Sequence, residues 1–337
     1  MKTQILSSKD IKIAADILKS GGLVAIPTET VYGLAANALD GKAVKNIFKA
    51  KGRPCDNPLI VHISHVDEIY NLVKEFPPVA QKLASEFWPG PLTMILKKSS
   101  IIPDEVSGGL DSVAIRLPSH PVARAIIKES GCALAAPSAN LSGSPSPTKA
   151  SHVIADLNGK IDAVVDAGVC NVGLESTVVS LCTSVPRLLR PGAITPEQLK
   201  NVLGDLEIDP AVVNQLQKDE VPLSPGMKYK HYAPKIKVVI LKGNKEQYIN
   251  YVNAIHNKNI AALCFEEDIK DLKVKSIVYG KENESSLQAE MLFDALREID
   301  KLKDIDVVYA RCPSTKGVGL AVYNRLIRAA GFNIIEI

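Results

Sequence analysis

The sequence contains no apolar run that approaches the roughly 18 residues of a candidate transmembrane helix. No apolar segment of the kind found in signal peptides follows Met1 either. The six cysteines include no Cys-x-x-Cys pair, which argues against a zinc site, and Cys132 and Cys264 lie in apolar runs, where free buried thiols are common. We therefore expect a cytoplasmic protein in a reducing compartment, with no membrane contact and no metal held by its own side chains.

A strong net charge is also absent, because 40 lysines and arginines are almost balanced by 37 aspartates and glutamates, for a net charge of +3. The net charge alone therefore does not predict a nucleic-acid partner. Cations do gather locally in two groups without an acidic residue, which are Lys42, Lys45, Lys49, Lys51 and Arg53, and then Lys228, Lys230, Lys235, Lys237, Lys242 and Lys245. These groups are either solvated surface or contacts for phosphate, on a nucleotide or on RNA.

The length of 337 residues and the apolar share of 46% suit two globular domains. We expect a first α/β domain over residues 1–208, a proline-rich linker over 209–235, and a smaller domain over 236–337. The linker segment from Met227 to Pro234, which includes Lys228, Tyr229, His231 and Tyr232, is either a lid over a binding site or a plain tether.

The hydrophobic pattern predicts alternating helices and strands in the first domain. A helix is expected over 7–20, and another begins at Thr195, where threonine, proline and glutamine form a capping box. Further helices are expected over 43–51, 66–73, 121–129 and 151–157, and strands over 23–27, 59–63, 92–96, 113–117, 133–136, 163–166, 177–181 and 187–189.

Strands and helices also alternate in the second domain, which predicts a small parallel sheet with helices on its faces. The expected strands cover 237–241, 260–265, 274–279, 306–310 and 333–337, and the expected helices cover 245–256, 286–301 and 319–330. No Gly-x-Gly-x-x-Gly sequence follows the first of these strands, so a dinucleotide site there has no support.

The most informative motif is the run from Pro27 to Leu34, PTETVYGL, which follows an apolar, strand-like stretch. A strand that ends in a turn of small polar residues can present hydroxyls and backbone N–H groups to a ligand. Most threonine-rich turns, however, only satisfy their own backbone. The motif therefore gains its weight from the other segments that accompany it.

Two further segments offer cations. Lys51 and Arg53 close a helix, and they suit either a polyanion or the negative end of the helix dipole. His62 lies within a strand, where a satisfied core position is more usual than a ligand contact. Arg116 shares one strand face with Ser112 and needs an anion partner, either a structural carboxylate or a ligand carboxylate.

Small polar residues recur after later strands. The run over 137–148, PSANLSGSPSPT, can receive phosphate and sugar oxygens, or it can simply cap the helix near Ser151. The runs LESTVV over 174–179 and RLLRPGAIT over 187–195 follow, and Arg190 ends an apolar strand, where an anion is again expected.

Together these motifs resemble those of the threonylcarbamoyl-AMP synthase family. The set is PTETVYGL, KGRP followed by NPLIVHI, PSANLSGSPSPT, LESTVV, RLLRPGAIT and SPGMKYKHYAP, and all six occur in this order before residue 235. The resemblance is to the long form of the family. It implies a YrdC-like domain, in which a twisted mixed sheet and surrounding helices enclose a deep cavity, followed by a smaller Rossmann-like parallel α/β domain.

The resemblance also implies the activity. Members of the family join L-threonine, bicarbonate or CO₂, and ATP into threonylcarbamoyl-AMP and release pyrophosphate, and Mg²⁺ is expected to accompany ATP. A separate tRNA-modifying threonylcarbamoyl transferase complex then passes the product to adenosine beside the anticodon of tRNA. The implied partners are ATP, threonine, bicarbonate and that complex, with a weak contact to RNA as a further candidate.

Residue by residue, the resemblance implies a site with a threonine end and a nucleotide end. Threonine contacts match Thr30, His62, Arg116, Ala136 and Ser176, and nucleotide contacts match Arg53, Asn57, Ser112, Ser138, Ser146 and Arg190. The central KxR and SxN set of the family matches Lys51, Arg53, Ser138 and Asn140. Either His231 or Tyr232 is expected to touch the nucleotide, and the sequence does not choose between them.

The residue types suit this chemistry, because a carbamate that attacks the α-phosphate needs positioning and charge neutralisation more than a protein nucleophile. The main alternative is a binding module without catalysis, in which the cations of 42–53 grip double-stranded or transfer RNA. A second alternative is the carbamoyl-adenylate chemistry of hydrogenase maturation proteins. That chemistry comes with zinc-finger and acylphosphatase-like segments, which this sequence lacks.

Overall fold

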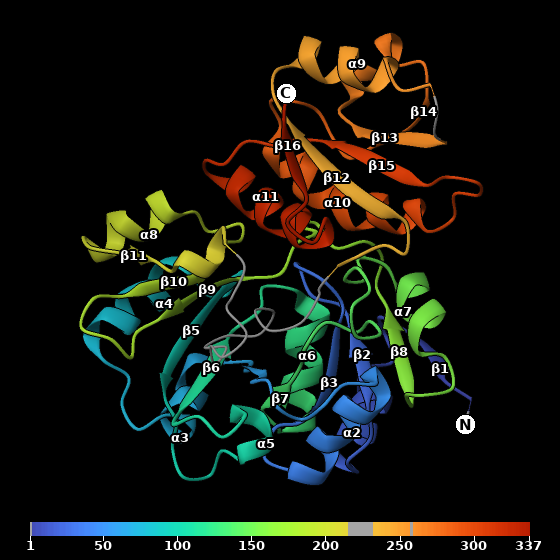
Figure 1. The fold of residues 1–337 in the computed structure, drawn as a ribbon. Helices are drawn as coiled ribbons and strands as arrows, with labels where there is room; N and C mark the ends of the chain where they lie inside the picture. The colour runs from blue at the N-terminus through green and yellow to red at the C-terminus, as the bar shows by residue number, and fades with distance from the viewer. Residues whose placement is uncertain (1, 215–231, 257–258) are drawn as a thin grey trace.

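The computed structural model describes residues 2–214, 232–256 and 259–337. These residues form two α/β regions, each built on its own sheet (Figure 1). In Figure 1 the C-terminal region, coloured orange to red, lies above the first region. Helices α10 (Ser285–Ile299) and α11 (Val318–Ala329) lie on the side of the C-terminal sheet that faces the first region.

The larger sheet has strands in the order β1-β8-β2-β3-β7-β4-β6-β5-β9-β10-β11. Parallel pairs such as β4 with β6 stand beside antiparallel pairs such as β5 with β6, so the sheet is mixed, as expected. The strands are β1 (Gln4–Ser7), β2 (Val24–Ile26), β3 (Gly33–Asn37), β4 (Ile60–His62), β5 (Leu92–Lys97), β6 (Ser112–Arg116), β7 (Leu134–Ala135), β8 (Ala163–Asp166), β9 (Thr177–Ser180), β10 (Arg187–Arg190) and β11 (Glu207–Ile208).

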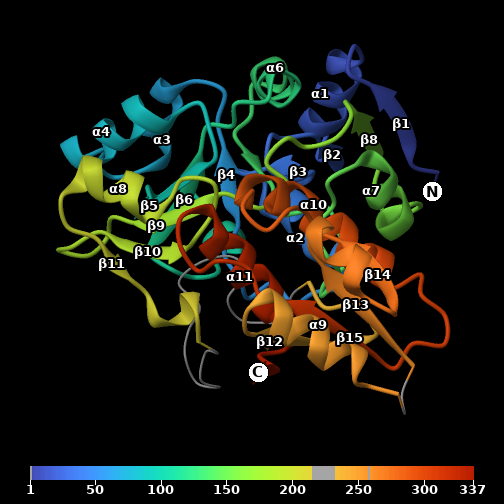
Figure 2. The same ribbon diagram turned by 90° about the horizontal axis from the view of Figure 1, so that it is seen from above.

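Helices surround this sheet (Figure 2). They are α1 (Ile11–Lys19), α2 (Gly41–Lys51), α3 (Ile69–Leu72), α4 (Pro78–Phe87), α5 (Asp104–Ser107), α6 (Pro121–Ser130), α7 (Ala150–Leu157) and α8 (Pro196–Leu203), with short 3₁₀ turns η1 (Val66–Glu68) and η2 (Pro210–Val212). Leu18 of α1 packs in one apolar cluster with Ile26, whereas Ile47 of α2 packs in another with Ala25. Because successive strand residues point to opposite faces, these two clusters cover opposite faces of the sheet.

A separate cluster contains only strand residues, namely Ile60, Ile95, Ala114, Val178 and Leu189. No helical side chain belongs to it within the described ranges. Ile60 also lines the cavity described below. The strands from β4 to β10 therefore bury one face under helices and turn part of the other face toward a binding space.

The C-terminal sheet has the strand order β14-β13-β15-β12-β16, and all of its pairs are parallel. Its strands are β12 (Lys237–Lys242), β13 (Ile260–Cys264), β14 (Lys275–Val278), β15 (Val307–Arg311) and β16 (Ile334–Glu336), and they are joined by α9 (Lys245–Asn253), η3 (Glu266–Asp271), α10 and α11. This arrangement confirms the small parallel α/β sheet predicted for residues 236–337. In the part of the chain that the structure describes, no helix has both the length and the apolar character needed to cross a membrane.

The structure departs from the predicted elements at several places. The helix predicted over 7–20 begins only at Ile11, because Ser7 ends β1 and pairs with Asp166 of β8. Strands β1, β3 and β11 and helices α4 and α5 were not predicted. The β3 sequence, GLAAN, has little intrinsic strand preference, and its place is decided by antiparallel pairing with β2 and β7. The linker predicted from 209 starts with the η2 turn, in which Ala211 and Val212 are buried.

Candidate active site

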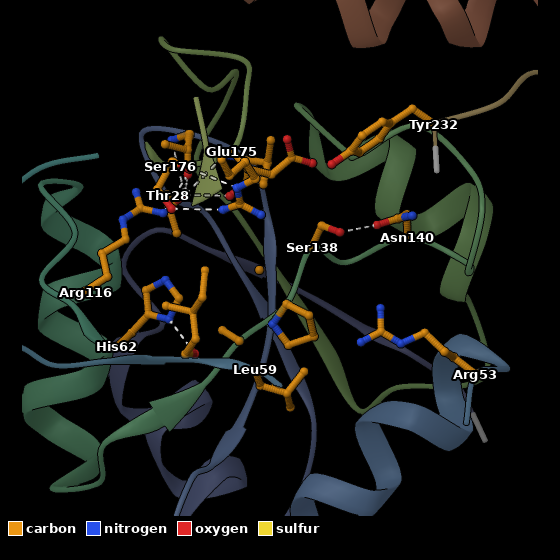
Figure 3. Close-up of a pocket in the computed structure, with 17 residues that line it drawn as sticks. Thr28, Arg53, Leu59, His62, Arg116, Ser138, Asn140, Glu175, Ser176 and Tyr232 are labelled. Carbon is orange, nitrogen blue, oxygen red and sulfur yellow. Dashed lines mark hydrogen bonds between the residues drawn. The ribbon is translucent and has the colours of Figure 1, made fainter. Parts of the chain in front are cut away.

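One cavity in the first region is lined by residues that are far apart in the sequence (Figure 3). Ten of the predicted site residues line it: Thr30, Arg53, His62, Arg116, Ala136, Ser138, Asn140, Ser176, Arg190 and Tyr232. In Figure 3, His62 and Arg116 lie on one side of the cavity, and Arg53, Ser138 and Asn140 lie on the opposite side. Side chains predicted for both ends of the site thus line a single space.

The turn after β2 is built by Thr28, which was not among the predicted site residues. Its Oγ1 donates to the carbonyl of Val31 at 2.6 Å and accepts from the backbone N–H of Thr30 at 3.2 Å. The two threonine hydroxyls are 2.9 Å apart. The turn therefore satisfies its own backbone and, at the same time, holds the hydroxyl of Thr30 at the cavity wall.

Arg116 ends β6 and is 3% exposed. Its anion partner is Glu29, whose carboxylate lies 2.7 Å from the guanidinium, and the guanidinium also donates to Thr30 Oγ1 at 2.9 Å. Burial raises the pKa of the Glu29 carboxyl, but the charge and hydrogen bonding of Arg116 outweigh it and lower that pKa. Of the two partners left open by the sequence, the structural carboxylate is therefore present, and Glu29 within PTET is a residue that the motif analysis did not assign.

His62 ends β4 and is almost completely buried beside Arg116. Its Nδ1 lies 3.2 Å from the carbonyl oxygen of Ile60, and since a carbonyl only accepts, Nδ1 carries the hydrogen. Burial and the positive charge of Arg116 lower the pKa of the imidazole to about 3. His62 is therefore neutral at physiological pH and adds no charge to this end of the cavity.

Lys51, the last residue of α2, does not line the cavity and is 3% exposed. Its Nζ donates to the carbonyls of Ser138 and Asn140, at 2.5 and 2.7 Å. Burial and the neighbouring Arg53 lower its pKa to about 7. The lysine of the KxR set thus holds the loop of the SxN set in place, and Ser138 Oγ donates to Asn140 Oδ1 at 2.5 Å within that loop.

Arg53 follows the left-handed C-cap residue Gly52, which ends α2 and turns the chain toward the cavity. Its guanidinium carbon lies 5.4 Å from the centre of the Phe48 ring, a cation–π distance that supports the side chain from the helix. Figure 3 shows Arg53 pointing into the cavity from the side opposite His62.

Ser176 and Arg190 meet where β9 begins and β10 ends. Arg190 donates to the carbonyl and the hydroxyl of Ser176, at 3.0 and 3.1 Å, and Ser176 Oγ is 2.7 Å from Thr93 Oγ1. Burial lowers the pKa of Arg190 to about 10, so the side chain is still charged near neutral pH. Strands β6 and β10 therefore each end in an arginine that lines the cavity.

Glu175 lines the cavity next to Ser176 and was not among the predicted site residues. Its Oε1 accepts from Ser146 Oγ at 2.5 Å, and its Oε2 accepts from Nε of Arg325 at 2.9 Å. Burial raises the pKa of this carboxyl, but Arg325, Arg190 and the two hydrogen bonds outweigh burial and hold it at about 2. The LESTVV motif contains Glu175, but nothing in the sequence links it to Arg325, which is 150 residues away.

Four predicted residues lie away from the cavity lining. Besides Lys51, these are Ser146, which is buried against Glu175, Ser112, which is half-buried at the start of β6, and Asn57. The Asn57 side chain is fully buried, and neither of its amide atoms has a hydrogen-bond partner in the part of the chain that the structure describes. His231, Lys228 and Tyr229 lie outside the described residues.

Within the described ranges, no group of three or more His, Cys, Asp or Glu side chains could hold a metal ion. Both carboxylates of the site, Glu29 and Glu175, are ion-paired with arginines. The cavity offers cations, hydroxyls and amides, which suits an anionic ligand.

Two family models match the chain. One, described as telomere recombination, matches residues 16–192, and the other, described as the C-terminal domain of threonylcarbamoyl-AMP synthase, matches residues 194–331. Threonylcarbamoyl-AMP synthase of Pyrococcus abyssi is 44% identical over 335 residues, which cover 97% of this chain and 96% of that protein. The protein of the same name from Bacillus subtilis is 46% identical over 342 residues, which cover 99% and 97%.

A solved structure is similar along the whole chain. The crystal structure of P. abyssi Sua5 complexed with L-threonine matches with a TM-score of 0.92 at 42% identity, and the match covers 99% of this chain and 100% of that one. The arrangement of the two sheets is thus shared with that structure. The chain belongs to the threonylcarbamoyl-AMP synthase family.

Proposed function

We propose that this protein is an L-threonylcarbamoyladenylate synthase, which converts L-threonine, bicarbonate or CO₂, and ATP into threonylcarbamoyl-AMP and pyrophosphate. The observation that carries the proposal is the convergence of Arg53, Arg116 and Arg190 with small hydroxyl and amide groups on one cavity. Membership of the family and the L-threonine complex of the P. abyssi protein support the same substrate.

The reaction divides into two bond-forming steps. The amine of threonine first adds to CO₂ and releases a proton, or reacts with bicarbonate and releases water, which gives a carbamate. A carbamate oxygen then attacks the α-phosphorus of ATP, and the bond to the bridging oxygen of the β-phosphate breaks, so that pyrophosphate leaves. Neither step needs a protein nucleophile, and both gain from fixed positions and from positive charge near the phosphates.

The threonine end is proposed at Thr30, His62, Arg116, Ala136 and Ser176. Arg116 and Thr28 fix the Thr30 hydroxyl from two sides, so it can take part in a directed contact without losing further freedom. The ion pair with Glu29 neutralises part of the positive charge of Arg116. The remaining N–H groups of its guanidinium are the proposed donors to the threonine carboxylate.

The nucleotide end is proposed at Arg53, Ser138, Asn140 and Arg190, which line the cavity, and at Tyr232, which lines it from the start of the C-terminal region. Asn57, Ser112, Ser146 and His231 remain predicted contacts. The buried amide of Asn57 lacks a hydrogen-bond partner among the described residues, and burying an unpaired amide costs free energy. A ligand that forms a hydrogen bond with this amide would remove that cost.

We further propose that ATP enters as its Mg²⁺ complex, in which phosphate oxygens and water supply most of the ligands. The product would pass to a threonylcarbamoyl transferase complex that modifies tRNA, in the cytoplasm. Contact with RNA is a weaker proposal, because it rests only on the cations of 42–53, and Lys45 among them is already paired with Glu105 at 3.0 Å.

The test is an ATP turnover assay with detection of the adenylate by mass, run with threonine, with serine and without an amino acid. Pyrophosphate and threonylcarbamoyl-AMP should form only when threonine and bicarbonate are both present. A protein that consumes no ATP but binds RNA, with an affinity that falls steeply as salt rises and ignores threonine, would establish the RNA-binding alternative instead.

Arg53→Ala tests the placement of the nucleotide end in the same assay. We expect turnover to fall by roughly 100-fold or more, because the phosphates lose a charged bidentate donor, while the folded state is little affected at this half-buried position. The control is Lys49→Ala, an exposed cation of the same helix, which should keep normal turnover. Near-normal turnover of the Arg53 variant would contradict the site.

A further inference from the structure

Helices α10 and α11 of the C-terminal region form many polar contacts with the first region. Arg297 of α10 pairs with Asp156 at 2.9 Å, Asp294 pairs with Lys149 at 2.8 Å, and Arg328 of α11 donates to the carbonyl of Ala211 at 2.7 Å. None of these three contacts reaches a residue that lines the cavity. A further contact of α11, made by Arg325, does reach one.

Arg325 is 0% exposed, and all three of its guanidinium nitrogens donate hydrogen bonds. Nε donates to Glu175 Oε2 at 2.9 Å, one terminal nitrogen donates to the carbonyl of Glu175 at 3.2 Å, and the other donates to the carbonyl of Pro191 at 2.7 Å. Asn324 Oδ1 accepts a further bond at 2.9 Å. A single side chain of α11 therefore ties together the residues next to Ser176 and Arg190.

The carboxylate of Glu175 links Arg325 to Ser146. Its second oxygen accepts from the fully buried hydroxyl of Ser146, so both oxygens are engaged, one by each region of the chain. Among the described residues, Glu175 interacts electrostatically with the cations Arg325 of α11, Arg190 of β10 and Lys51 of α2. The titratable hydroxyl of Tyr232 also lies close enough to interact with it.

The backbone around Glu175 is held equally closely. Gly173 has φ +75°, and a Cβ at this position would lie 2.4 Å from Cα of Glu290 in α10, so only glycine allows the approach. Leu174 and Val31 belong to the same apolar cluster as Phe293 of α10. The segment before Glu175 is thus pressed against the C-terminal helices over several residues.

We propose that Arg325 is a positioning residue of the nucleotide end, which holds Glu175, Pro191 and Ser146 in place and cancels the negative charge of Glu175 beside the triphosphate. The proposal rests on the proposed function. Without the guanidinium, an uncompensated carboxylate would face the space that a polyanion must enter, and Arg190 would be drawn toward it. This gives the C-terminal region a direct part in the active site.

The main variant is Arg325→Gln, and its matched control is Arg297→Gln, which breaks a partly buried arginine–carboxylate pair between the same two regions. Neither member of that pair lines the cavity. KM is measured for ATP and for threonine separately. We expect Arg325→Gln to raise KM for ATP roughly tenfold or more and KM for threonine less than about threefold, while Arg297→Gln leaves both nearly unchanged.

The double variant Glu175→Gln with Arg325→Gln removes both charges, so it should recover most of the lost affinity for ATP. Equal changes in both KM values, an Arg297 variant that matches the Arg325 variant, or a double variant no better than the single one would each overturn the proposal. If Arg325→Gln does not fold, Arg325→Lys replaces it. Lysine keeps the charge but cannot bind Glu175 and Pro191 at the same time. We therefore expect KM for ATP to rise more than KM for threonine, but by less than in Arg325→Gln.

The wild-type protein is assayed first, since a lack of threonine-dependent pyrophosphate release would refute the proposed function and not the role of Arg325. The role is then measured by calorimetric binding of a non-hydrolysable ATP analogue, which requires no turnover. Weaker binding by Arg325→Gln than by Arg297→Gln supports the inference, and equal binding refutes it.

Discussion

Two buried carboxylates lie in or next to the cavity lining, and each of them is ion-paired with an arginine. Glu29 is held by Arg116, and Glu175 is held by Arg325. A buried pair of this kind contributes modestly when intact, but removal of one member leaves an uncompensated charge out of water, which is strongly destabilising. The residues that prepare the site for anions are therefore also sites where single substitutions are costly.

The first prediction compares a buried pair with an exposed one. Arg116→Ala should lower the free energy of unfolding by about 3–5 kcal/mol, since it leaves the Glu29 carboxylate buried and unpaired. Arg187→Ala breaks the exposed pair with Glu207 and should cost less than about 1 kcal/mol. Urea denaturation measures both, and equal losses would show that burial of the Glu29 pair has no energetic consequence.

The second prediction concerns pH. The pKa of Glu175 is held at about 2, below its ordinary value of 4.5, so its ionised form stabilises the folded state above pH 4.5. This contribution is lost as the pH falls from 4.5 toward 2. The stability difference between the wild type and Arg325→Gln should therefore be largest near neutral pH and should shrink over that interval in urea denaturation. A difference that is constant with pH would contradict the assignment.

At the scale of elements, the binding space lies beside strand ends and the ends of helices. Thr30 follows β2, Arg116 ends β6, Ser138 follows β7 and Arg190 ends β10, while α2 delivers Arg53 just beyond its C-cap. Each residue is placed by the end of an element, where the chain leaves regular hydrogen bonding. Helix α8 differs, because none of its residues lines the cavity and its first turn is closed by a capping box.

The third prediction tests the start of α8. Thr195 Oγ1 accepts from the backbone N–H of Gln198 at 3.3 Å, and Gln198 Oε1 accepts from the N–H of Thr195 at 2.9 Å, which confirms the predicted capping box. Thr195→Ala should therefore lower the free energy of unfolding by about 1 kcal/mol. Thr195→Ser, which retains the acceptor, should cost much less, and a loss as large as that of alanine would refute the cap.

At the scale of the whole molecule, the two regions share one apolar cluster. Val31 and Leu174 of the first region pack with Phe293 and other residues of the C-terminal region, next to the buried contacts of Arg325. Separation of the regions would expose this cluster and leave buried charges unpaired. The two sheets should therefore not unfold independently.

The fourth prediction follows from this shared interface. Thermal unfolding of the wild-type protein should give one calorimetric transition, with a van't Hoff enthalpy close to the calorimetric enthalpy. In Arg325→Gln the coupling between the regions is weaker, so the transition should broaden or divide. Two separate transitions in the wild type would show that the shared cluster contributes little.

Local patterns predicted much of the fold, because periodicity and capping depend on neighbouring residues. The parallel C-terminal sheet, the strands from 59 to 190 and the start of α8 all follow from them. The alanine-rich β3 did not, since pairing with β2 and β7 decides its conformation. In the same way the sequence predicted Thr30, Arg53 and Arg190 in the site, whereas no local pattern links Glu175 to Arg325.

The sequence by itself determined which kinds of groups are available to a ligand, because hydroxyls, amides and arginines follow the ends of the predicted strands and helices. It also determined the family, through six motifs. Tertiary structure alone decided that Lys51 supports a loop behind the cavity, that Glu29 pairs with Arg116, and that the C-terminal region contributes Arg325. These are contacts between residues that are distant in the sequence. The first two form because the first region folds around its own sheet, and the third forms because α11 packs against that region.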